Sequence, residues 1–121
     1  MASQEDVRRI ALSLPEAVED PAEFHFRVDG KLFVWAWNER VDPRWARVPR
    51  SDVVAVRVRD ESEKEILIDM EPRVFFTEPH YDGYPAVLVR LTEIDLDLLA
   101  KLVHDAWRTR APKRLRTSVG A

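Results

Sequence analysis

The chain has 121 residues, of which 45% are hydrophobic and 34% are charged, a size and balance that fit one domain with its own core. The absence of cysteine excludes disulfides, thiolate metal sites and a cysteine nucleophile. The net charge of -3 excludes a general electrostatic attraction to nucleic acid.

The first predicted element is a helix from about Gln4 to Ser13. Ser3 is a suitable N-cap, and Asp6 stands at the position where a capping box has its acidic partner. Apolar residues then recur at the spacing of one helix face: Val7, Ile10, Ala11 and Leu14. Pro15 ends the helix, because proline disfavours the helical conformation for the residue before it.

A β-hairpin is predicted next. Residues 23–29 alternate between apolar and polar side chains, and residues 31–37 form the partner strand. Asp29-Gly30 between them is a strong signal for a two-residue turn. In the second strand we expect Phe33, Trp35 and Trp37 to share one face, with apolar residues also on the other, which indicates a central strand covered on both sides.

The middle of the chain is predicted to hold a loop, a strand and a short helix. Residues 38–50 are interpreted as a loop in which Trp45 needs a packing partner, and residues 53–58 as a β-branched strand. Ser62 and Glu65 have capping-box spacing, so a second helix should begin there and end before Pro72.

The last predicted elements are a strand and a long helix. Residues 74–76 form a short extended piece, a loop follows from residue 77 to 85, and residues 86–91 form a strand. Asp95 should cap the final helix, which Pro112 ends. Its apolar stripe is Leu98, Leu99, Leu102, Val103, Ala106 and Trp107.

The element order is therefore α-β-β-β-α-β-α, which predicts an α+β fold with an antiparallel sheet packed against helices. Residues 1–114 should form a single domain, and residues 115–121 a flexible basic tail. No segment looks like a signal peptide or a membrane span, so we expect a cytoplasmic protein with no membrane partner. A monomer or weak dimer is expected.

The loop around His80-Tyr81-Asp82-Gly83-Tyr84-Pro85 is the first candidate site. One interpretation is a binding lip, in which His80 and Asp82 contact a polar ligand and Tyr81 and Tyr84 supply rings. The other is a rigid turn whose tyrosines pack on the sheet while Asp82 bonds to backbone amides. If the protein were an enzyme, His80 oriented by Asp82 would be its acid–base pair, but a non-catalytic role is the expectation.

The C-terminal segment is the second candidate site. Residues 108–121 contain five basic residues and no acidic one, and the rest of the chain has 14 basic and 22 acidic residues, a net charge of -8. These cations could contact phosphates, or they could offset the helix dipole and remain solvated. The candidate nucleic-acid contacts are Lys31, Arg108, Arg110, Lys113 and Arg114.

Neither a metal nor a cofactor is expected. His25, His80 and His104 stand on a strand, a loop and a helix, without the paired spacing of zinc or iron sites. Three glycines form no phosphate loop, and no serine has the context of a nucleophile elbow.

Two parts of the sequence resemble the MmcQ/YjbR family. They are residues 75–91, which contain the His80–Pro85 loop, and the hairpin residues 26–33, which are similar to the family's F-x-V-x-G-K-x-F pattern. The resemblance extends from the first helix through Arg114. It implies a frataxin-like (CyaY-like) two-layer sandwich and a DNA-binding role, by analogy with a double-wing arrangement in which hairpins and a helix approach the duplex.

The resulting hypothesis is a DNA-binding protein of the MmcQ/YjbR type. The alternative is a module that binds a small ligand or a protein through His80–Tyr84. A continuous basic surface from Lys31 to the tail would favour DNA, and a concave pocket beside His80 would favour a ligand.

Overall fold

In the computed structural model of the chain, the described residues are 1–20, 22–39 and 48–118. The strands are β1 (Val18–Asp20), β2 (His25–Val28), β3 (Lys31–Glu39), β4 (Val48–Arg57), β5 (Phe75–Phe76) and β6 (Ala86–Arg90). The helices are α1 (Gln4–Leu12), α2 (Glu61–Met70), α3 (Leu96–Arg110) and α4 (Lys113–Ser118), with a short 3₁₀ helix η1 (Pro79–Tyr81).

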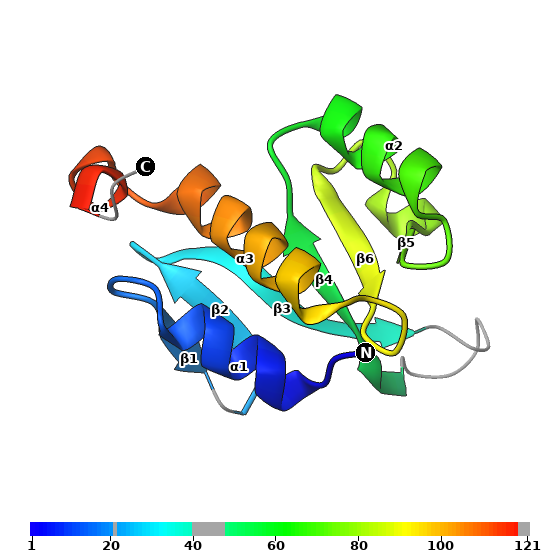
Figure 1. Cartoon of the computed structure of the whole chain (residues 1–121), viewed down its shortest axis with the longest axis horizontal. Helices are drawn as coiled ribbons and strands as arrows, with labels where there is room; N and C mark the ends of the chain where they lie inside the picture. Colours follow the sequence, from blue (N-terminus) through cyan, green and yellow to red (C-terminus); the bar gives the residue numbers. More distant parts are fainter. Residues whose placement is uncertain (21, 40–47, 119–121) are drawn as a thin grey trace.

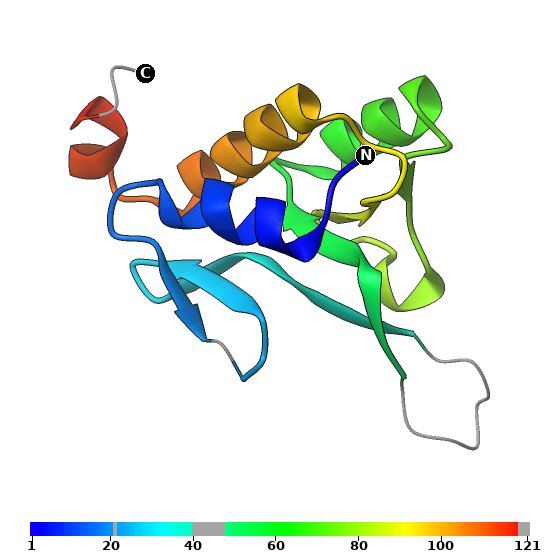
Figure 2. The ribbon, with the colours of Figure 1, turned by 60° about the horizontal axis from the view of Figure 1, so that its bottom comes forward.

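The strands form one antiparallel sheet in the order β1-β2-β3-β4-β6-β5. Figure 1 shows α1 and α3 lying across it, with α2 beside β5 and β6. After the rotation of Figure 2, these helices lie on one side of the sheet. The predicted α+β sandwich is thus confirmed, with the edge strand β1 and the helix α4 as additional elements.

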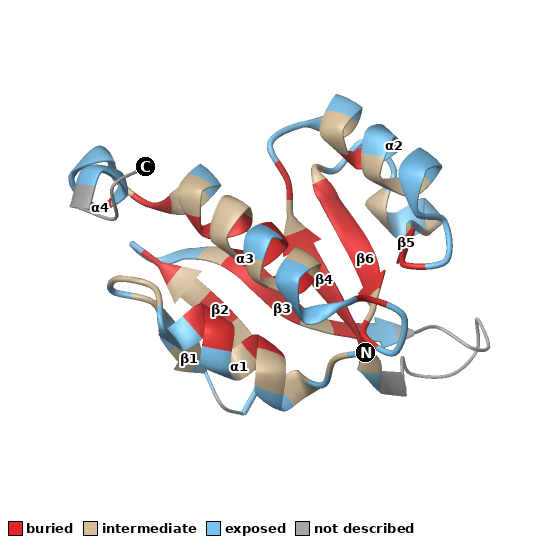
Figure 3. Ribbon diagram, viewed as in Figure 1, coloured by how far each residue is buried: buried red, intermediate tan, exposed pale blue. Residues whose placement is uncertain are grey.

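The core lies between the sheet and the helices (Figure 3). Phe26, Val34 and Val89 contribute to it from the sheet, and Val7 from α1. The predicted stripe of α3 is buried except for the half-buried Leu98. The largest buried ring, Trp107, donates its indole N–H to the backbone oxygen of Pro15 at 3.0 Å. Each large apolar side chain buried here stabilises the fold by roughly 1.5–3 kcal/mol.

Two of the three predicted helix caps are confirmed. Ser3 and Asp6 form the complete capping box of α1, and the Asp95 side chain accepts a hydrogen bond from the Leu98 amide at 2.8 Å. The cap predicted at Ser62 is wrong. Asp60 caps α2 instead, because its carboxylate accepts from the Glu63 amide at 2.9 Å and adds negative charge at the helix N-terminus.

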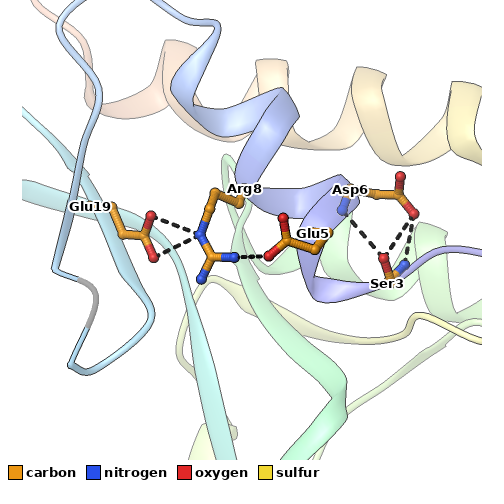
Figure 4. A network of polar contacts seen from close by, with 5 residues as sticks. All are labelled: Ser3, Glu5, Asp6, Arg8 and Glu19. Atoms are coloured by element: carbon orange, nitrogen blue, oxygen red, sulfur yellow. Dashed lines mark hydrogen bonds and ion pairs between the residues drawn. The ribbon is translucent and has the colours of Figure 1, made fainter.

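Arg8 attaches α1 to the edge strand β1 (Figure 4). Its Nε donates to both carboxylate oxygens of Glu19, at 2.9 and 3.0 Å, and its terminal nitrogen contacts Glu5. The guanidinium carbon also lies 5.3 Å from the centre of the Phe24 ring. The short strand β1 therefore has a side-chain anchor in addition to its pairing with β2.

The expected face assignment of β3 is wrong in part, because β3 contains a β-bulge. Phe26 pairs with Val34 but Arg27 pairs with Leu32, so Phe33 is the extra residue. Phe33 consequently joins Val34 in the core under the helices, whereas Leu32 joins the cluster of Trp35 and Trp37.

The interpretation of residues 38–50 as a loop also needs correction. Strand β3 continues to Glu39 and β4 begins at Val48, with Trp37 paired to Arg50 after a second irregularity. The hairpin of β3 and β4 is therefore longer than the interpretation of residues 38–50 as a loop predicted. The predicted packing of Trp45 lies outside the described residues.

The segment expected to be a flexible tail begins in α4. Leu115 is buried at 7% exposure, and the Arg114 guanidinium donates to both carboxylate oxygens of Glu16, at 2.8 and 3.2 Å. One apolar anchor and one ion pair thus fix α4 to the domain, neither of which is visible in the local sequence. The predicted tail residues 119–121 lie outside the described part of the chain.

Candidate ligand-binding site

The face of the sheet opposite α1 and α3 has its own apolar cluster, here called the aromatic face. It consists of six buried residues with three half-buried ones at its border: Trp35, Trp37, Val53, Ala55, Ala86 and Leu88, then Leu32, Phe76 and Tyr81. Trp35 and Trp37 are two residues apart on β3 and therefore project from the same face. The long helices of the described residues lie on the other side of the sheet, and the His80–Pro85 loop reaches this face through Tyr81.

The loop is held in place by its own backbone and by a buried lysine. Lys64 of α2, only 3% exposed, donates its ammonium N–H bonds to the backbone oxygens of Tyr81 at 2.7 Å and Tyr84 at 3.1 Å. Gly83 has a φ of +75°, a conformation that is strained for residues with a side chain. The Tyr84 amide also donates to the Tyr81 oxygen at 3.0 Å, closing the turn.

A cavity of about 290 Å³ lies between this loop and the start of β3. Its walls are three aromatic rings, one aliphatic side chain and one imidazole: Trp35, Tyr81, Tyr84, Leu32 and His80. The Trp35 indole N–H donates to the Tyr81 hydroxyl at 3.0 Å, which fixes both rings. The Tyr84 ring lies edge-on to both, with centroids 6.1 Å from Tyr81 and 6.3 Å from Trp35.

Polar groups stand at the rim of this cavity. The Arg57 guanidinium lies 5.4 Å from the centre of the Tyr84 ring and 3.5 Å from its hydroxyl oxygen. His80 is exposed, with its ring centroid 6.0 Å from that of Tyr81. An apolar interior with a few polar groups at its edge is the usual composition of a small-molecule site.

Three of the four residues predicted in this loop line the cavity: His80, Tyr81 and Tyr84. Asp82 does not line it. Its backbone amide donates to the Pro79 oxygen at 3.2 Å, and its side chain is exposed. The loop is therefore a rigid turn that also forms one wall of the cavity, but within the described residues the expected bond from the Asp82 side chain to backbone amides is not among its contacts.

Comparison with known proteins gives the family of this chain. The YjbR family model matches residues 12–109. The chain belongs to the YjbR family. It is 46% identical over 121 residues to proteins named as uncharacterised from Mycobacterium tuberculosis (Rv2570) and Mycobacterium bovis (Mb2600), over 95% of this chain and 93% of each relative.

The fold of this YjbR domain is also similar to a crystal structure of the Deinococcus radiodurans protein DR2400, which has a DUF419 domain. The TM-score is 0.68 at 19% identity, covering 99% of this chain and 89% of the other. At that identity the likeness concerns the fold alone.

The candidate nucleic-acid residues of the YjbR domain do not all line one cavity. Arg108 and Lys113 line a cavity of about 210 Å³ with Arg116, whereas Lys31 is exposed at the β2–β3 turn. Arg114 is paired with Glu16; this hydrogen bond raises the pKa of Arg114, and Asp29 adds a weaker charge interaction. Arg110 is half-buried near the end of α3.

Several residues of the site were not predicted from the sequence. Leu32 faces the cavity because of the bulge at Phe33, and Arg57, at the end of β4, contacts Tyr84 in the cavity wall. Lys64 lies 17 residues before the carbonyl it binds, on a helix with many charged neighbours, so no local pattern marks it. For Trp35 a general signal exists, because large aromatic rings with a polar group suit binding surfaces.

The described parts of the chain contain neither a metal cluster nor a membrane-spanning helix. No group of three or more histidine, cysteine, aspartate or glutamate side chains there could hold a metal ion. In the same ranges no helix has both the length and the apolar character to cross a bilayer.

Proposed function

We propose that this YjbR domain is a binding module whose cavity beside η1 takes a small ligand with a flat apolar body and a polar substituent. The observation that carries the proposal is the open cavity of about 290 Å³ lined by Trp35, Tyr81, Tyr84, Leu32 and His80. A concave pocket beside His80 is the feature expected for a ligand-binding role. The volume of this cavity is close to the lower end of the range for small-molecule sites.

The lining determines the chemistry of the ligand. Aromatic walls favour a planar apolar group through stacking and edge-on contacts. His80 offers a hydrogen-bond donor or acceptor at the rim, and Arg57 offers a cation beside Tyr84. A carboxylate or phenol on the ligand would bind there. The hydroxyl oxygen of Tyr81 accepts the Trp35 hydrogen bond, which holds the ring in place as part of the wall.

The proposed role is non-catalytic. Acid–base catalysis by His80 would need a second group to orient the imidazole or share the proton. Among the described residues no carboxylate lines this cavity, and Asp82 is not part of its wall. The expectations of a cytoplasmic location and of a monomer or weak dimer remain predictions.

An NMR titration with a cavity-filling variant tests the proposal. Indole and 4-hydroxybenzoate serve as probes, and amide shifts should concentrate at residues 32–35 and 80–84. Leu32→Trp should abolish these shifts, because the added ring occupies the cavity, while Leu12→Trp on the exposed face of α1 should leave them unchanged. Scattered shifts, or equal shifts in both variants, would contradict the proposal.

DNA is the second candidate function, and one observation favours it. Arg114 of α4 is near enough to Asp29 of the β2–β3 turn for their charges to interact, so Lys113 and Lys31, which neighbour these residues, are on the same side of the domain. Figure 1 shows α4 and this turn at the same end. A hairpin and a helix that approach together are what the family resemblance implies for a duplex contact.

Fluorescence anisotropy with a labelled duplex tests this candidate. Affinity should fall steeply with salt, and replacing Lys31 and Lys113 by alanine should reduce the log–log slope by about 0.9 for each phosphate that is no longer neutralised. Arg9→Ala on α1, which removes one positive charge elsewhere, is the control for each single lysine replacement. A flat titration at low salt would rule out the DNA role.

A further inference from the structure

A larger cavity, here called the arginine cleft, lies between the start of α2, the outer side of α3 and α4. Its volume is about 540 Å³. Its lining residues come from three segments, the start of α2, the helix α3 and the helix α4, and Figure 1 shows α4 following the C-terminal end of α3. The charged side chains that line it are Arg59, Glu63, Lys101, Asp105, Arg108 and Arg116.

The cations of the arginine cleft differ in whether an acid neutralises them. Lys101 pairs with Asp105 at 2.7 Å, and Arg59 contacts the Asp60 carboxylate at 3.3 Å. For Arg108 and Arg116, no acidic partner is found within the described ranges of the chain. Two uncompensated guanidinium groups therefore line one cavity.

The fold fixes where these two arginines lie. Arg108 is half-buried in the last turns of α3. Arg116 is on α4, which is anchored to the domain by the buried Leu115 and by the Arg114–Glu16 ion pair. These anchors set the backbone positions of both arginines, and both side chains line the same cavity, so one bound anion can be contacted by both.

The geometry points to an anion site in the arginine cleft for a phosphorylated small molecule. The planar guanidinium donors of Arg108 and Arg116 match a phosphate group, to which arginine binds with two parallel hydrogen bonds. Glu63 and Asp105 line the same cavity and accept hydrogen bonds from hydroxyl or amino groups. They also repel further negative charge, which favours one phosphate on a polar body over a continuous nucleic-acid backbone.

This site is separate from the aromatic cavity, with which it shares no lining residue. The result of testing one proposal therefore does not decide the other. A phosphate ester at the arginine cleft would contact α3 and α4, whereas the aromatic ligand would contact β3 and the loop of Tyr81 and Tyr84.

The test is an NMR titration with ribose 5-phosphate, inorganic phosphate and ribose as probes. Ribose 5-phosphate should bind saturably and shift the side-chain Nε–H signals of Arg108 and Arg116. Inorganic phosphate should shift the same signals with lower affinity, because it lacks the hydroxyl groups that Glu63 and Asp105 would accept. Ribose alone should cause no saturable shift, since it lacks the anion.

Variants show whether the two arginines bind the phosphate directly. Arg108→Gln and Arg116→Gln should each weaken ribose 5-phosphate binding by about tenfold or more, the usual effect of losing a charge-assisted hydrogen bond. Arg116 is exposed, so its replacement should leave the fold intact. Lys31→Gln removes the same charge at the hairpin and should change the affinity less than about twofold. The absence of saturable binding at low salt, or an equal loss in Lys31→Gln and Arg116→Gln, would overturn the inference.

Discussion

The indole nitrogen of Trp35 donates a hydrogen bond of 3.0 Å to the hydroxyl of Tyr81, 46 residues later in the chain. This contact joins a central strand to the loop that closes the aromatic cavity. Lys64 holds the same loop through its backbone oxygens. The ligand site is thus built by three segments that are distant in sequence, and its shape depends on two hydrogen-bonded anchors.

Tyr81→Phe should destabilise the domain by about 1–2 kcal/mol, because it leaves the indole N–H of Trp35, a residue 9% exposed, without its acceptor. Urea unfolding followed by circular dichroism measures the change. The matched control is Tyr84→Phe. The hydroxyl of Tyr84 accepts only a 3.5 Å contact from Arg57, and the Tyr84 side chain is exposed. Equal losses in the two variants would show that the Trp35–Tyr81 bond has no special role.

Lys64→Met should destabilise the domain by about 1–2 kcal/mol through the loss of two charge-assisted hydrogen bonds. The loss is moderate because each carbonyl keeps a backbone partner, the Tyr84 amide for Tyr81 and the Ala86 amide for Tyr84. Amide hydrogen exchange should accelerate mainly in residues 80–84.

The control for this variant is Lys101→Met. Lys101 is an exposed lysine in an i, i+4 pair with Asp105, which contributes only about 0.3–0.5 kcal/mol. Uniformly faster exchange across the sheet in Lys64→Met would mean that Lys64 supports the whole core and has no specific effect on the loop.

The parts of the fold that local rules determine were predictable. The Asp29-Gly30 turn is one: both residues have positive φ, at 52° and 74°, as a two-residue type I′ turn requires. The caps at Ser3 and Asp95 and the stripe of α3 are others, since each depends on residues within a few turns of one helix. The rigid turn at Gly83 follows from its φ preference in the same way.

The features of the fold that the sequence did not predict depend on contacts between residues that are far apart in the chain. The bulge at Phe33 exchanges the faces of Leu32 and Phe33, and nothing in the alternation of apolar residues marks it. The helix α4 folds onto the domain through Glu16, which is 98 residues away from Arg114. The cavity itself is formed by β3 and the loop together, so neither segment indicates it alone.

Gly83→Ala should lower the stability by about 1 kcal/mol, because an alanine at a φ of +75° adopts a strained left-handed conformation. Steric overlap does not contribute, since a Cβ at this position meets nothing within 4 Å. Gly83→Asn is the matched control and should lose less, because asparagine tolerates this conformation better. Urea unfolding of both variants gives the comparison, and an equal loss would point to an effect other than backbone strain.

The ion pair between Glu16 and Arg114 should stabilise α4 in a pH-dependent way. The hydrogen bond from Arg114 lowers the pKa of the Glu16 carboxyl below its ordinary value of about 4.3. A carboxyl whose pKa is lower in the folded state contributes its stabilisation above the unfolded pKa and loses it as the pH falls through the folded pKa. Glu16→Gln should therefore reduce the melting temperature at neutral pH, and the difference from the wild type should shrink as the pH falls below the ordinary carboxyl pKa and vanish once Glu16 is protonated in the folded state.

Thermal unfolding of the wild type and Glu16→Gln across this pH range measures the effect. Arg114→Gln should give the same pH profile, because it removes the other partner of the pair. Glu23→Gln, at an exposed position, controls for the loss of one negative charge and should leave the melting temperature unchanged. Added salt should shrink the difference at neutral pH, since both partners are more than half exposed and are screened by ions. A difference that persists unchanged at low pH would show that Glu16 holds α4 by packing, with no contribution from its charge.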